Sequence, residues 1–544
     1  MLGHDAIAKA LHDQGVNVAF GVVGDANVFI VDALVRNHGL AYTAAAHESS
    51  AVQMAIGYAR ASGRLGVATV THGPGLTNAI TPLVEAVRAN TAMVLVCGDT
   101  AADARHHLQK IGQRELIRAT GAGFEPVRSG ATIGADVAQA VRRAYTERRP
   151  VVLNVPYDLE FIDVPEPTAA RVEPFAAAVT ADPAALDQAV GIIASANRPL
   201  VLAGRGVVSS GAREALLRLA ARLGAPVATT LMANGLFRGE PFNLGIFGTL
   251  ASTVGSEAIA SADCVIAFGA GLNDMTTYSG TLLEGKRVVH CDIDPARIGL
   301  LARYDAALVG DAGRVADTIV AWLDEAEHKP SGFRSPELEL RLRDHDPASE
   351  FVDRSTATSV DPRTLTLALD RLLPERRTLV YDGGRYMVHA LQLTPNDPMS
   401  FVTSTSFGSI GLGLGHAIGA ATARPDQPTV LLAGDGGFMM GCLVELNTAI
   451  QSGLDMIIVI YNDGSYGAEH IQFHTKNMDP GLSLHRWPSF AAVAQAMGAV
   501  GITVHNVDEL NSLLPSALEN LNGVVVVDVK LDPQIISTHT GAAH

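Results

Sequence analysis

Short apolar runs alternate with segments of helical periodicity along most of this 544-residue chain. Val18–Val22, Pro199–Ala203 and Met456–Tyr461 are such runs, and strands buried on both faces of a parallel sheet have this continuous apolar character. The segments between them, such as Ser49–Ala61 and Phe490–Met497, have the residue spacing of helices. Strands that alternate with helices predict doubly wound parallel sheets, so we expect an α/β fold.

Two stretches interrupt this alternation. Phe161–Pro183 is rich in proline and alanine, and Glu325–Asp361 is polar, charged and contains proline. A chain of this length exceeds what one hydrophobic core supports, so we interpret both stretches as links between domains. We predict domains at 1–165, 184–326 and 360–544, joined by linkers at 166–183 and 327–359.

The amino-acid composition argues against several classes of partner and location. Asp and Glu total 56 against 40 Lys and Arg, and no basic run is present, which argues against nucleic acid and anionic membranes as partners. The four cysteines are scattered without the spacing of metal ligands, so we predict buried free thiols in a reducing compartment. We see neither a signal peptide nor an apolar span of membrane length, and we expect a cytoplasmic protein.

The sharpest motif is Gly434-Asp435-Gly436-Gly437, which directly follows the apolar run Val430–Ala433. Its glycines allow backbone N–H groups to approach an anion. Asn462-Asp463-Gly464 ends the next apolar run, so Asp435 and Asn462 should lie at the ends of adjacent strands. A carboxylate, an amide oxygen and the Gly464 carbonyl form the hard oxygen set that Mg²⁺ prefers, with water or phosphate completing the shell. We therefore predict Asp435, Asn462 and Gly464 as metal ligands.

A lone Gly-Asp-Gly is common in turns, but its pairing with Asn462 resembles the thiamine diphosphate motif. The chain is similar over most of its length to the family of acetolactate synthase, pyruvate decarboxylase and benzoylformate decarboxylase. That resemblance implies a pyrimidine-binding domain, a central nucleotide-like domain and a diphosphate-binding domain, with thiamine diphosphate and Mg²⁺ as cofactors. It implies diphosphate contacts from residues near the motif: Gly434, Gly436, Gly437 and Tyr466.

Glu48 begins a predicted helix and resembles the family's activating glutamate. In the family this residue hydrogen-bonds N1′ of the aminopyrimidine and starts a proton relay, while the cofactor supplies the carbon chemistry. The segment Thr71–Asn78 resembles the stretch that follows it, with Gly73 and Asn78 as expected cofactor contacts, and His72 stands where serine is commoner. Further cofactor contacts that the resemblance implies are Gly408 and Ile410 at the pyrimidine, and Asp382 and Gly384 near the diphosphate.

Four residues resemble the catalytic set of the decarboxylases. Asp25 lies in Gly24-Asp25-Ala26-Asn27, His106 and His107 are adjacent, and Glu469 follows Asn462 by seven positions. Two acids and two imidazoles around one carbon could protonate an enamine and release an aldehyde. Each of these residues would also fit an ordinary turn, loop or solvated helix.

Leu108-Gln109 points instead toward acetolactate synthases and benzaldehyde lyase, in which the glutamine faces the reacting carbon. The lysine that acetolactate synthases carry further on is missing, and its place falls near Ala122. We favour decarboxylation of a 2-oxo acid, with an acetolactate-synthase-like carboligase as the alternative. A non-catalytic cofactor-binding relative is a third hypothesis, but mere binding would not require Glu48.

The middle segment carries Gly204-Arg205-Gly206 and Phe268-Gly269-Ala270-Gly271. Glycines after strands also commonly mark turns that have no binding role. Some family members hold FAD or ADP in this domain and others hold nothing, and we expect an empty structural domain here. Because Glu48 and Asp435 fall in separate domains, the resemblance also implies a homodimer or homotetramer with active sites at the subunit interface.

Overall fold

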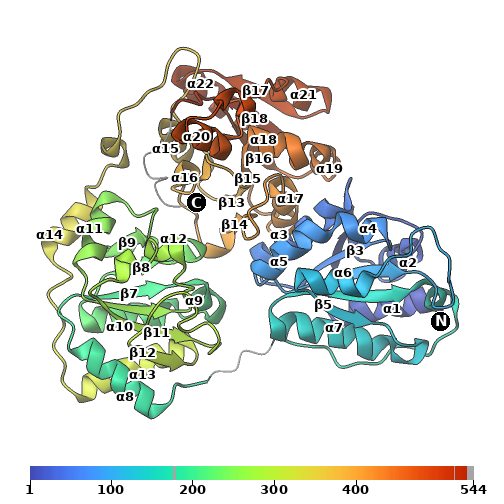
Figure 1. Ribbon diagram of the computed structural model, residues 1–544, viewed down its shortest axis with the longest axis horizontal. Helices are drawn as coiled ribbons and strands as arrows, with labels where there is room; N and C mark the ends of the chain where they lie inside the picture. Colours follow the sequence, from blue (N-terminus) through green and yellow to red (C-terminus); the bar gives the residue numbers. More distant parts are fainter. Residues whose placement is uncertain (175–178, 520, 536–544) are drawn as a thin grey trace. The chain divides into compact units, whose positions relative to one another are not determined.

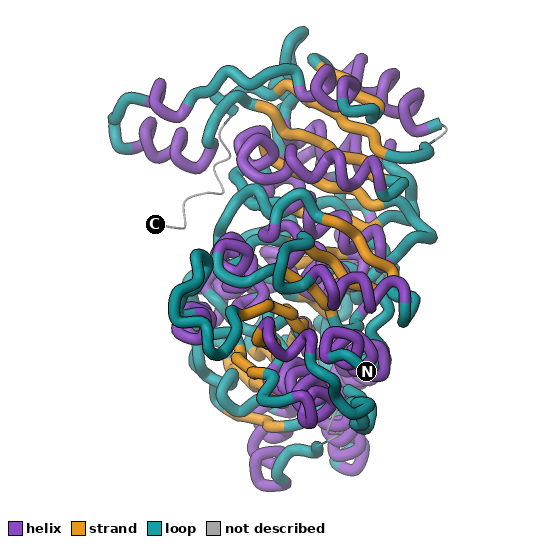
Figure 2. The backbone as a smooth tube through the Cα atoms, turned by 90° about the vertical axis from the view of Figure 1, so that its right-hand side faces the viewer, coloured by secondary structure: helices purple, strands orange, loops and turns teal. Residues whose placement is uncertain are grey.

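The computed structural model describes residues 1–174, 179–519 and 521–535, and its strands form three six-stranded parallel sheets (Figure 1). Figure 2 shows helices packed alongside the strands throughout. The predicted α/β fold class with three doubly wound domains is confirmed. Residues 175–178 of the first predicted linker and residues 520 and 536–544 of the third predicted domain lie outside the described residues.

The first sheet has the strand order β2-β1-β3-β4-β6-β5. Helices α1 and α7 cover one face, where they bury an apolar cluster that includes Ile7, Leu11 and Val141, while α3 and α5 cover the other face. The strands are β1 Val18–Gly21, β2 Ala41–Ala44, β3 Gly66–Val70, β4 Met93–Asp99, β5 Gly123–Pro126 and β6 Pro150–Pro156. The helices are α1 Gly3–Asp13, α2 Val28–Arg36, α3 Glu48–Ser62, α4 Pro74–Asn78, α5 Ile80–Arg88, α6 Gln113–Thr120 and α7 Ile133–Glu147.

The last sheet repeats this order, β14-β13-β15-β16-β18-β17, so the first and third domains share one topology. Its strands are β13 Thr378–Tyr381, β14 Phe401–Thr403, β15 Thr429–Gly434, β16 Met456–Asn462, β17 Val500–Val504 and β18 Val524–Lys530. The helices are α15 Pro362–Leu372, α16 Met387–Ala390, α17 Gly413–Ala423, α18 Asp435–Gly437, α19 Leu446–Gln451, α20 Gly467–Thr475, α21 Phe490–Ala496 and α22 Val507–Leu518.

The middle sheet has a different order, β12-β11-β10-β7-β8-β9, which is the order of a dinucleotide-binding fold. Its strands are β7 Pro199–Ala203, β8 Val227–Thr229, β9 Asn243–Ile246, β10 Cys264–Phe268, β11 Arg287–Asp292 and β12 Ala306–Val309. Its helices are α8 Pro183–Ala194, α9 Arg205–Ser210, α10 Arg213–Leu223, α11 Thr253–Ser261, α12 Asp274–Thr277, α13 Ala312–Glu325 and α14 Pro336–Arg343. Helix α14 falls within the predicted linker 327–359, and Leu338 on it joins this unit's apolar core.

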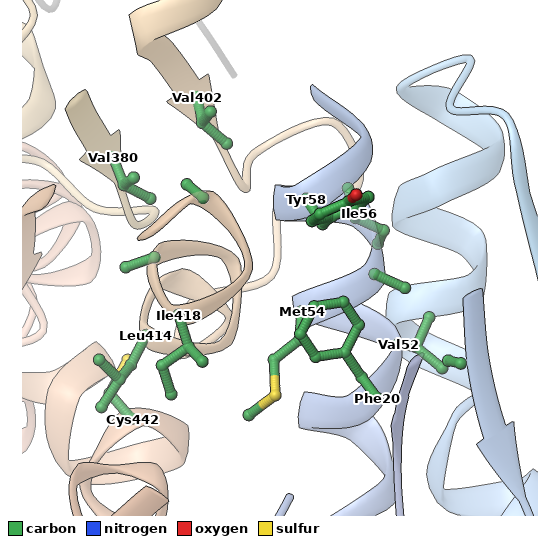
Figure 3. Close-up of a cluster of buried hydrophobic side chains, with 14 of the residues drawn as sticks. Phe20, Val52, Met54, Ile56, Tyr58, Val380, Val402, Leu414, Ile418 and Cys442 are labelled. Atoms are coloured by element: carbon green, nitrogen blue, oxygen red, sulfur yellow. The ribbon is translucent and has the colours of Figure 1, made fainter. Parts of the chain in front are cut away.

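Helices α3 and α17 join the first and third domains. They pack at backbone distance, because a Cβ on Gly57 would lie 2.0 Å from the His416 carbonyl oxygen, and one on Gly419 would lie 1.9 Å from that of Met54. Around this crossing, one continuous apolar cluster includes side chains of both sheets and both helices (Figure 3). The two domains therefore share a hydrophobic core and form one compact unit.

Two further sequence-based expectations can be compared with the structure. All four cysteines are buried free thiols, as predicted. Within the described part of the chain, no helix combines the length and the apolar character needed to cross a bilayer.

Replacing Gly57 with alanine should destabilise the protein, although alanine is the better helix former. The added methyl group would overlap the backbone of α17, and overpacking of this kind costs about 1–3 kcal/mol or more. Gly191→Ala on α8 is the control, because its Cβ meets no atom within 4 Å and the change should stabilise by about 0.5–1 kcal/mol. Thermal unfolding of the two variants should move Tm in opposite directions, and an unchanged Tm for Gly57→Ala would contradict the packing.

Glu160 predicts a pH dependence of stability. Its side chain is fully buried without a hydrogen-bond partner for either oxygen, and burial raises its pKa from 4.5 to about 8. Between these two pH values the folded chain retains a proton that the unfolded chain has lost, so stability falls as pH rises through that window. Glu160→Gln should therefore match the wild-type Tm near pH 4.5 and exceed it near pH 8.5. The exposed Glu284→Gln should show no such divergence, and parallel wild-type and Glu160→Gln curves would refute the argument.

Candidate active site

Asp435 and Gly464 meet at the carboxyl ends of the adjacent strands β15 and β16. The Asp435 carboxylate accepts hydrogen bonds from the N–H of Gly436 at 2.7 Å and from the N–H of Gly464 at 2.7 Å. Burial and, second to it, the nearby charge of Asp463 raise the pKa of Asp435 to about 7, and the hydrogen bonds from Gly436 and Gly464 act in the opposite direction. A buried acid with a raised pKa at a strand end is the environment that a cation would stabilise.

Asn462 is held in a defined orientation beside Asp435. Its Nδ2 donates to Oδ1 of Asp528 at 2.8 Å, and the other oxygen of that fully buried carboxylate pairs with Lys530 at 2.8 Å. Because an ionised carboxylate only accepts, the amide group facing it is the NH₂, which leaves the Asn462 oxygen free to bind a cation. Sequence reasoning missed Asp528, since its only local signal is a single acid within an apolar strand.

These three positions fit a magnesium ion chemically. They offer one carboxylate, one amide oxygen and the Gly464 carbonyl, which accepts one hydrogen bond from the His485 N–H at 2.7 Å and retains a second lone pair. No group of three or more His, Cys, Asp or Glu side chains suited to a metal occurs in residues 1–174, 179–519 and 521–535. A cation at Asp435 would therefore depend on oxygens from a bound phosphate or water to complete its shell.

Within the Gly434–Gly437 turn, Gly436 and Gly437 leave no space for a side chain. A Cβ on Gly436 would lie 2.6 Å from the Tyr466 ring, and one on Gly437 would lie 2.5 Å from the Asp382 carboxylate. Gly434 ends β15 and precedes α18, so all three glycines present backbone at the start of the helical segment. Tyr466 thus covers the predicted phosphate-binding turn.

Tyr466 belongs to a small aromatic group with His485 and Trp487. The His485 ring meets Tyr466 edge-on at 4.6 Å and stacks on Trp487 at 4.8 Å. Nε2 of His485 and Nε1 of Trp487 are buried without hydrogen-bond partners. Neither residue lies in one of the motifs from which the sequence predicts the site.

Asp382 holds the loop that the resemblance assigns to the pyrimidine. Its fully buried carboxylate accepts from the N–H groups of Gly411 at 2.8 Å and Leu412 at 3.1 Å and from the Ser404 hydroxyl at 3.2 Å. Burial raises its pKa to about 6, and these hydrogen bonds act in the opposite direction. Ile410 lies against Gly383 and Gly437, so this loop also adjoins the Asp435 turn.

The remaining predicted contacts of the third domain are placed as follows. Gly384 lies beside the Tyr386 ring, and Gly408 faces open space. Arg385, which follows Gly384, forms an ion pair with Asp463. Ser465 donates to the same carboxylate from its N–H and its hydroxyl. Both Asp463 oxygens therefore already have partners, so we do not count Asp463 among the candidate metal ligands.

Glu48 is the first residue of α3 and is half-buried. Its Oε2 accepts from Nδ2 of Asn78 at 3.0 Å, so a residue predicted to contact the cofactor also contacts the predicted activator. Gly73 donates its N–H to Oε1 of Gln113 at 2.8 Å and packs against the backbone of Gln109. The sequence signal did not identify Gln113, which is buried and links Gly73 to Asn154.

The residues that suggested decarboxylation are only partly brought together. The His107 ring lies 5.0 Å from the ring of buried His72, and the charge of Asp25 acts on His72. Burial, followed by His107, lowers the pKa of His72, whereas Asp99 and Asp25 raise it. His106 is exposed, and so is Glu469 on α20 of the third domain. No contact between Glu469 and the histidines is present among the described residues.

Gln109 is more enclosed than its neighbours. Leu108 is fully exposed, whereas Oε1 of Gln109 is buried without a hydrogen-bond partner. A buried carbonyl oxygen without a donor is a position at which a ligand hydroxyl or N–H would restore a lost bond.

Two domains share one topology, with a candidate cation site at the strand ends of one and a glutamate at a helix start of the other, and this arrangement fits the α/β enzymes that use a diphosphate cofactor. Family comparisons specify the class. The chain matches the thiamine pyrophosphate enzyme N-terminal TPP binding domain over residues 1–117, the central domain over 186–319 and the C-terminal TPP binding domain over 382–529. The chain belongs to the thiamine pyrophosphate (thiamine diphosphate) enzyme family.

Curated relatives cover nearly the whole chain. A probable acetolactate synthase large subunit of Methanocaldococcus jannaschii is 30% identical over 98% of this chain and 92% of its own length. A sulfoacetaldehyde acetyltransferase of Roseovarius nubinhibens is 30% identical over 96% of this chain and 90% of its own length. The acetolactate synthase isozyme 3 large subunit of Escherichia coli is 28% identical over 97% and 95%.

Asp435→Asn should abolish stabilisation by the cofactor and Mg²⁺ without harming the free protein. The substitution removes a buried acid with a raised pKa, which favours the folded state at pH 8. It also places an NH₂ opposite the N–H of Gly436 or Gly464, so the two effects oppose each other and Tm of the free protein should change little. The Tm increase on adding thiamine diphosphate with Mg²⁺ should disappear. Asp463→Asn is the neighbouring control, and it should retain most of that increase. An unchanged ligand-induced shift in Asp435→Asn would remove Asp435 from the site.

Proposed function

We propose that this chain is a thiamine-diphosphate- and Mg²⁺-dependent carboligase that removes CO₂ from a 2-oxo acid and joins the remaining acyl unit to a second acceptor. The arrangement of Asp435, Asn462 and Gly464 at two adjacent strand ends carries the cofactor part of the proposal. Glu48, on the other cofactor-binding domain, carries the catalytic part, because cofactor binding alone needs no acid there.

Each residue has a defined task in this scheme. Asp435, Asn462 and Gly464 would hold Mg²⁺, and the glycine backbone at 434–437 would face the diphosphate. Glu48, positioned by Asn78, would exchange a proton with the aminopyrimidine. When bound, thiamine diphosphate supplies a carbon nucleophile and an acceptor for the electrons released with CO₂.

The acceptor step separates carboligation from simple decarboxylation. The names of the relatives describe the synthesis of acetolactate and the transfer of an acetyl group, and they support delivery of the acyl unit to an acceptor. Gln109 supports the same reading, because its buried unpaired oxygen could bind a hydroxyl of the acceptor or product. Carboligation therefore replaces aldehyde release as the favoured hypothesis.

Release of a free aldehyde is the second candidate function. It is supported by the group formed by His107, His72 and Asp25, which could donate a proton to the acyl carbon. It is weakened by the exposure of all four residues of the predicted decarboxylase set: Asp25, His106, His107 and Glu469. We also infer that the protein is a dimer or tetramer, in which Glu48 of one copy serves the Asp435 site of another. We further infer that the central domain holds neither FAD nor ADP.

Product analysis tests the choice directly. The protein loaded with thiamine diphosphate and Mg²⁺ is incubated with pyruvate, benzoylformate or phenylpyruvate, with and without an added aldehyde. We expect hydroxyketone or acetolactate-type products in excess of free aldehyde. Free aldehyde as the sole product would overturn carboligation in favour of the second candidate.

Glu48→Gln should lower turnover by a factor of about 100 or more, the usual contribution of a positioned acid–base group. Gln still accepts a hydrogen bond from Asn78, so Tm and cofactor-induced stabilisation should remain close to wild type. Glu115→Gln changes an exposed glutamate in the first turn of α6 and serves as the matched control. Undiminished turnover in Glu48→Gln would refute the assigned proton transfer.

A further inference from the structure

Two fully buried carboxylates link the first and third domains in opposite directions. Glu85 of the first domain accepts from the N–H groups of Ser406 at 3.0 Å and Phe407 at 2.6 Å in the third. Glu445 of the third domain accepts from the N–H groups of Ala46 and His47 in the first, both at 3.0 Å through Oε1. Its Oε2 also accepts from Ala46 at 3.2 Å. Each acid is thus bound to the backbone of the other domain.

The two acids occupy equivalent places in the shared topology. Glu85 lies on α5 between β3 and β4, and Glu445 lies in the turn Leu443–Glu445 between β15 and β16. These strand pairs hold the same positions in the two sheets. The two links are therefore related by the same internal equivalence as the domains, and they flank the α3–α17 crossing.

Neither acid forms an ion pair within the described residues, so backbone N–H groups supply its hydrogen bonds. Removing an ionised carboxylate from water is costly, and charge-assisted bonds of this kind offset that cost. Each carboxylate has two oxygens, and each contact uses two backbone donors. Such a pair of bonds fixes both the position and the direction of the bound turn.

The bound turns immediately precede the residues assigned to the cofactor. Ala46 and His47 directly precede Glu48, and His47 is the N-cap of α3. Ser406 and Phe407 directly precede Gly408 and the Ile410 loop. A change in either turn would displace the adjacent site residue, and a displacement of about 1 Å can reduce catalysis about 100-fold.

We propose that Glu445 and Glu85 are positioning residues, with Glu445 orienting the activating Glu48 and Glu85 orienting the 408–410 loop that receives the pyrimidine. The inference rests on the proposed function for the roles of Glu48 and that loop. Neither residue is one of the predicted cofactor contacts, and the two have different roles. Glu445 affects cofactor activation, and Glu85 affects cofactor binding.

Glutamine is the informative substitution at both positions. It keeps the shape of the side chain but replaces one acceptor oxygen with an NH₂ donor, which would face a backbone N–H donor. Glu160→Gln is the matched control, because Glu160 is equally buried but contacts neither turn through its carboxyl oxygens. All three variants are made in the full chain.

The first measurement is amide hydrogen exchange by mass spectrometry, without cofactor. Glu445→Gln should increase exchange in peptides covering 44–50, and Glu85→Gln should increase it in peptides covering 404–410. The control should change neither. Equal exchange in all variants would overturn the proposed links whatever the enzyme's reaction.

The second measurement separates binding from activation on the holoenzyme. The Kd of thiamine diphosphate with Mg²⁺ is measured by calorimetry, and the exchange of its C2 proton by quenched NMR. Glu445→Gln should slow C2 exchange about tenfold or more and change Kd less than about threefold, whereas Glu85→Gln should raise Kd about tenfold with C2 exchange at saturation within about threefold. Identical effects of the two variants, or none, would overturn the division of labour.

Two safeguards keep the outcomes distinct. If either glutamine variant does not fold, the aspartate variant is measured instead, since its carboxylate is one methylene shorter and should give the same pattern. If the wild-type protein shows no C2 exchange, the proposed function fails, while the amide exchange result still decides whether the carboxylates hold the two turns.

Discussion

The packing of α3 against α17 is the constraint on which the site depends. Gly57 and Gly419 bring the two helices to backbone distance, and the apolar cluster around them merges the cores of two domains with one topology. Glu48 begins one of these helices, and the 407–411 loop leads into the other. The crossing therefore sets the positions of both candidate cofactor-binding segments before any side chain of the site is considered.

Buried acids complete this arrangement, and each is bound mainly by backbone N–H groups. Asp435 links the candidate metal-binding turn to Gly464, and Asp382 holds the loop predicted to bind the pyrimidine. Glu85 and Glu445 link one domain to the other. A buried carboxylate is tolerated only with such partners, so each of these acids restricts its turn to one geometry. The loops of the candidate site are thereby tied by hydrogen bonds to the domains that support them.

Much of this architecture could be predicted from residue patterns. The strand Pro199–Ala203 was predicted to the residue, and the predicted runs Val18–Val22 and Met456–Tyr461 each differ from the observed strand by one residue, because buried parallel strands are continuous apolar runs. Edge strands such as β2 and β14 were not predicted, since they are only four and three residues long and lack such a run. The predicted helical segments Ser49–Ala61 and Phe490–Met497 differ from α3 and α21 by no more than one residue at either end.

The candidate site also contains residues that the sequence predicts and residues that it does not. Asp435, Asn462 and Glu48 were found because each lies in a short motif at the end of a strand or the start of a helix. Their supports were not found, because the contacts are distant in sequence: Asp528 lies 66 residues from Asn462, and Glu445 lies 399 residues from Ala46. Nothing local distinguishes such an acid from one on the surface, and only the folded chain brings the partners together.

The central claim is that Asp435, Asn462 and Gly464 form the metal site of a thiamine diphosphate enzyme. A crystal structure of the protein grown with thiamine diphosphate and Mn²⁺ in place of Mg²⁺ tests it most directly, since the anomalous signal of manganese locates the ion. The account predicts one strong peak in contact with the Asp435 carboxylate, the Asn462 amide oxygen, the Gly464 carbonyl and the diphosphate. A cofactor bound with its metal elsewhere, or no ion at these three oxygens, would contradict it.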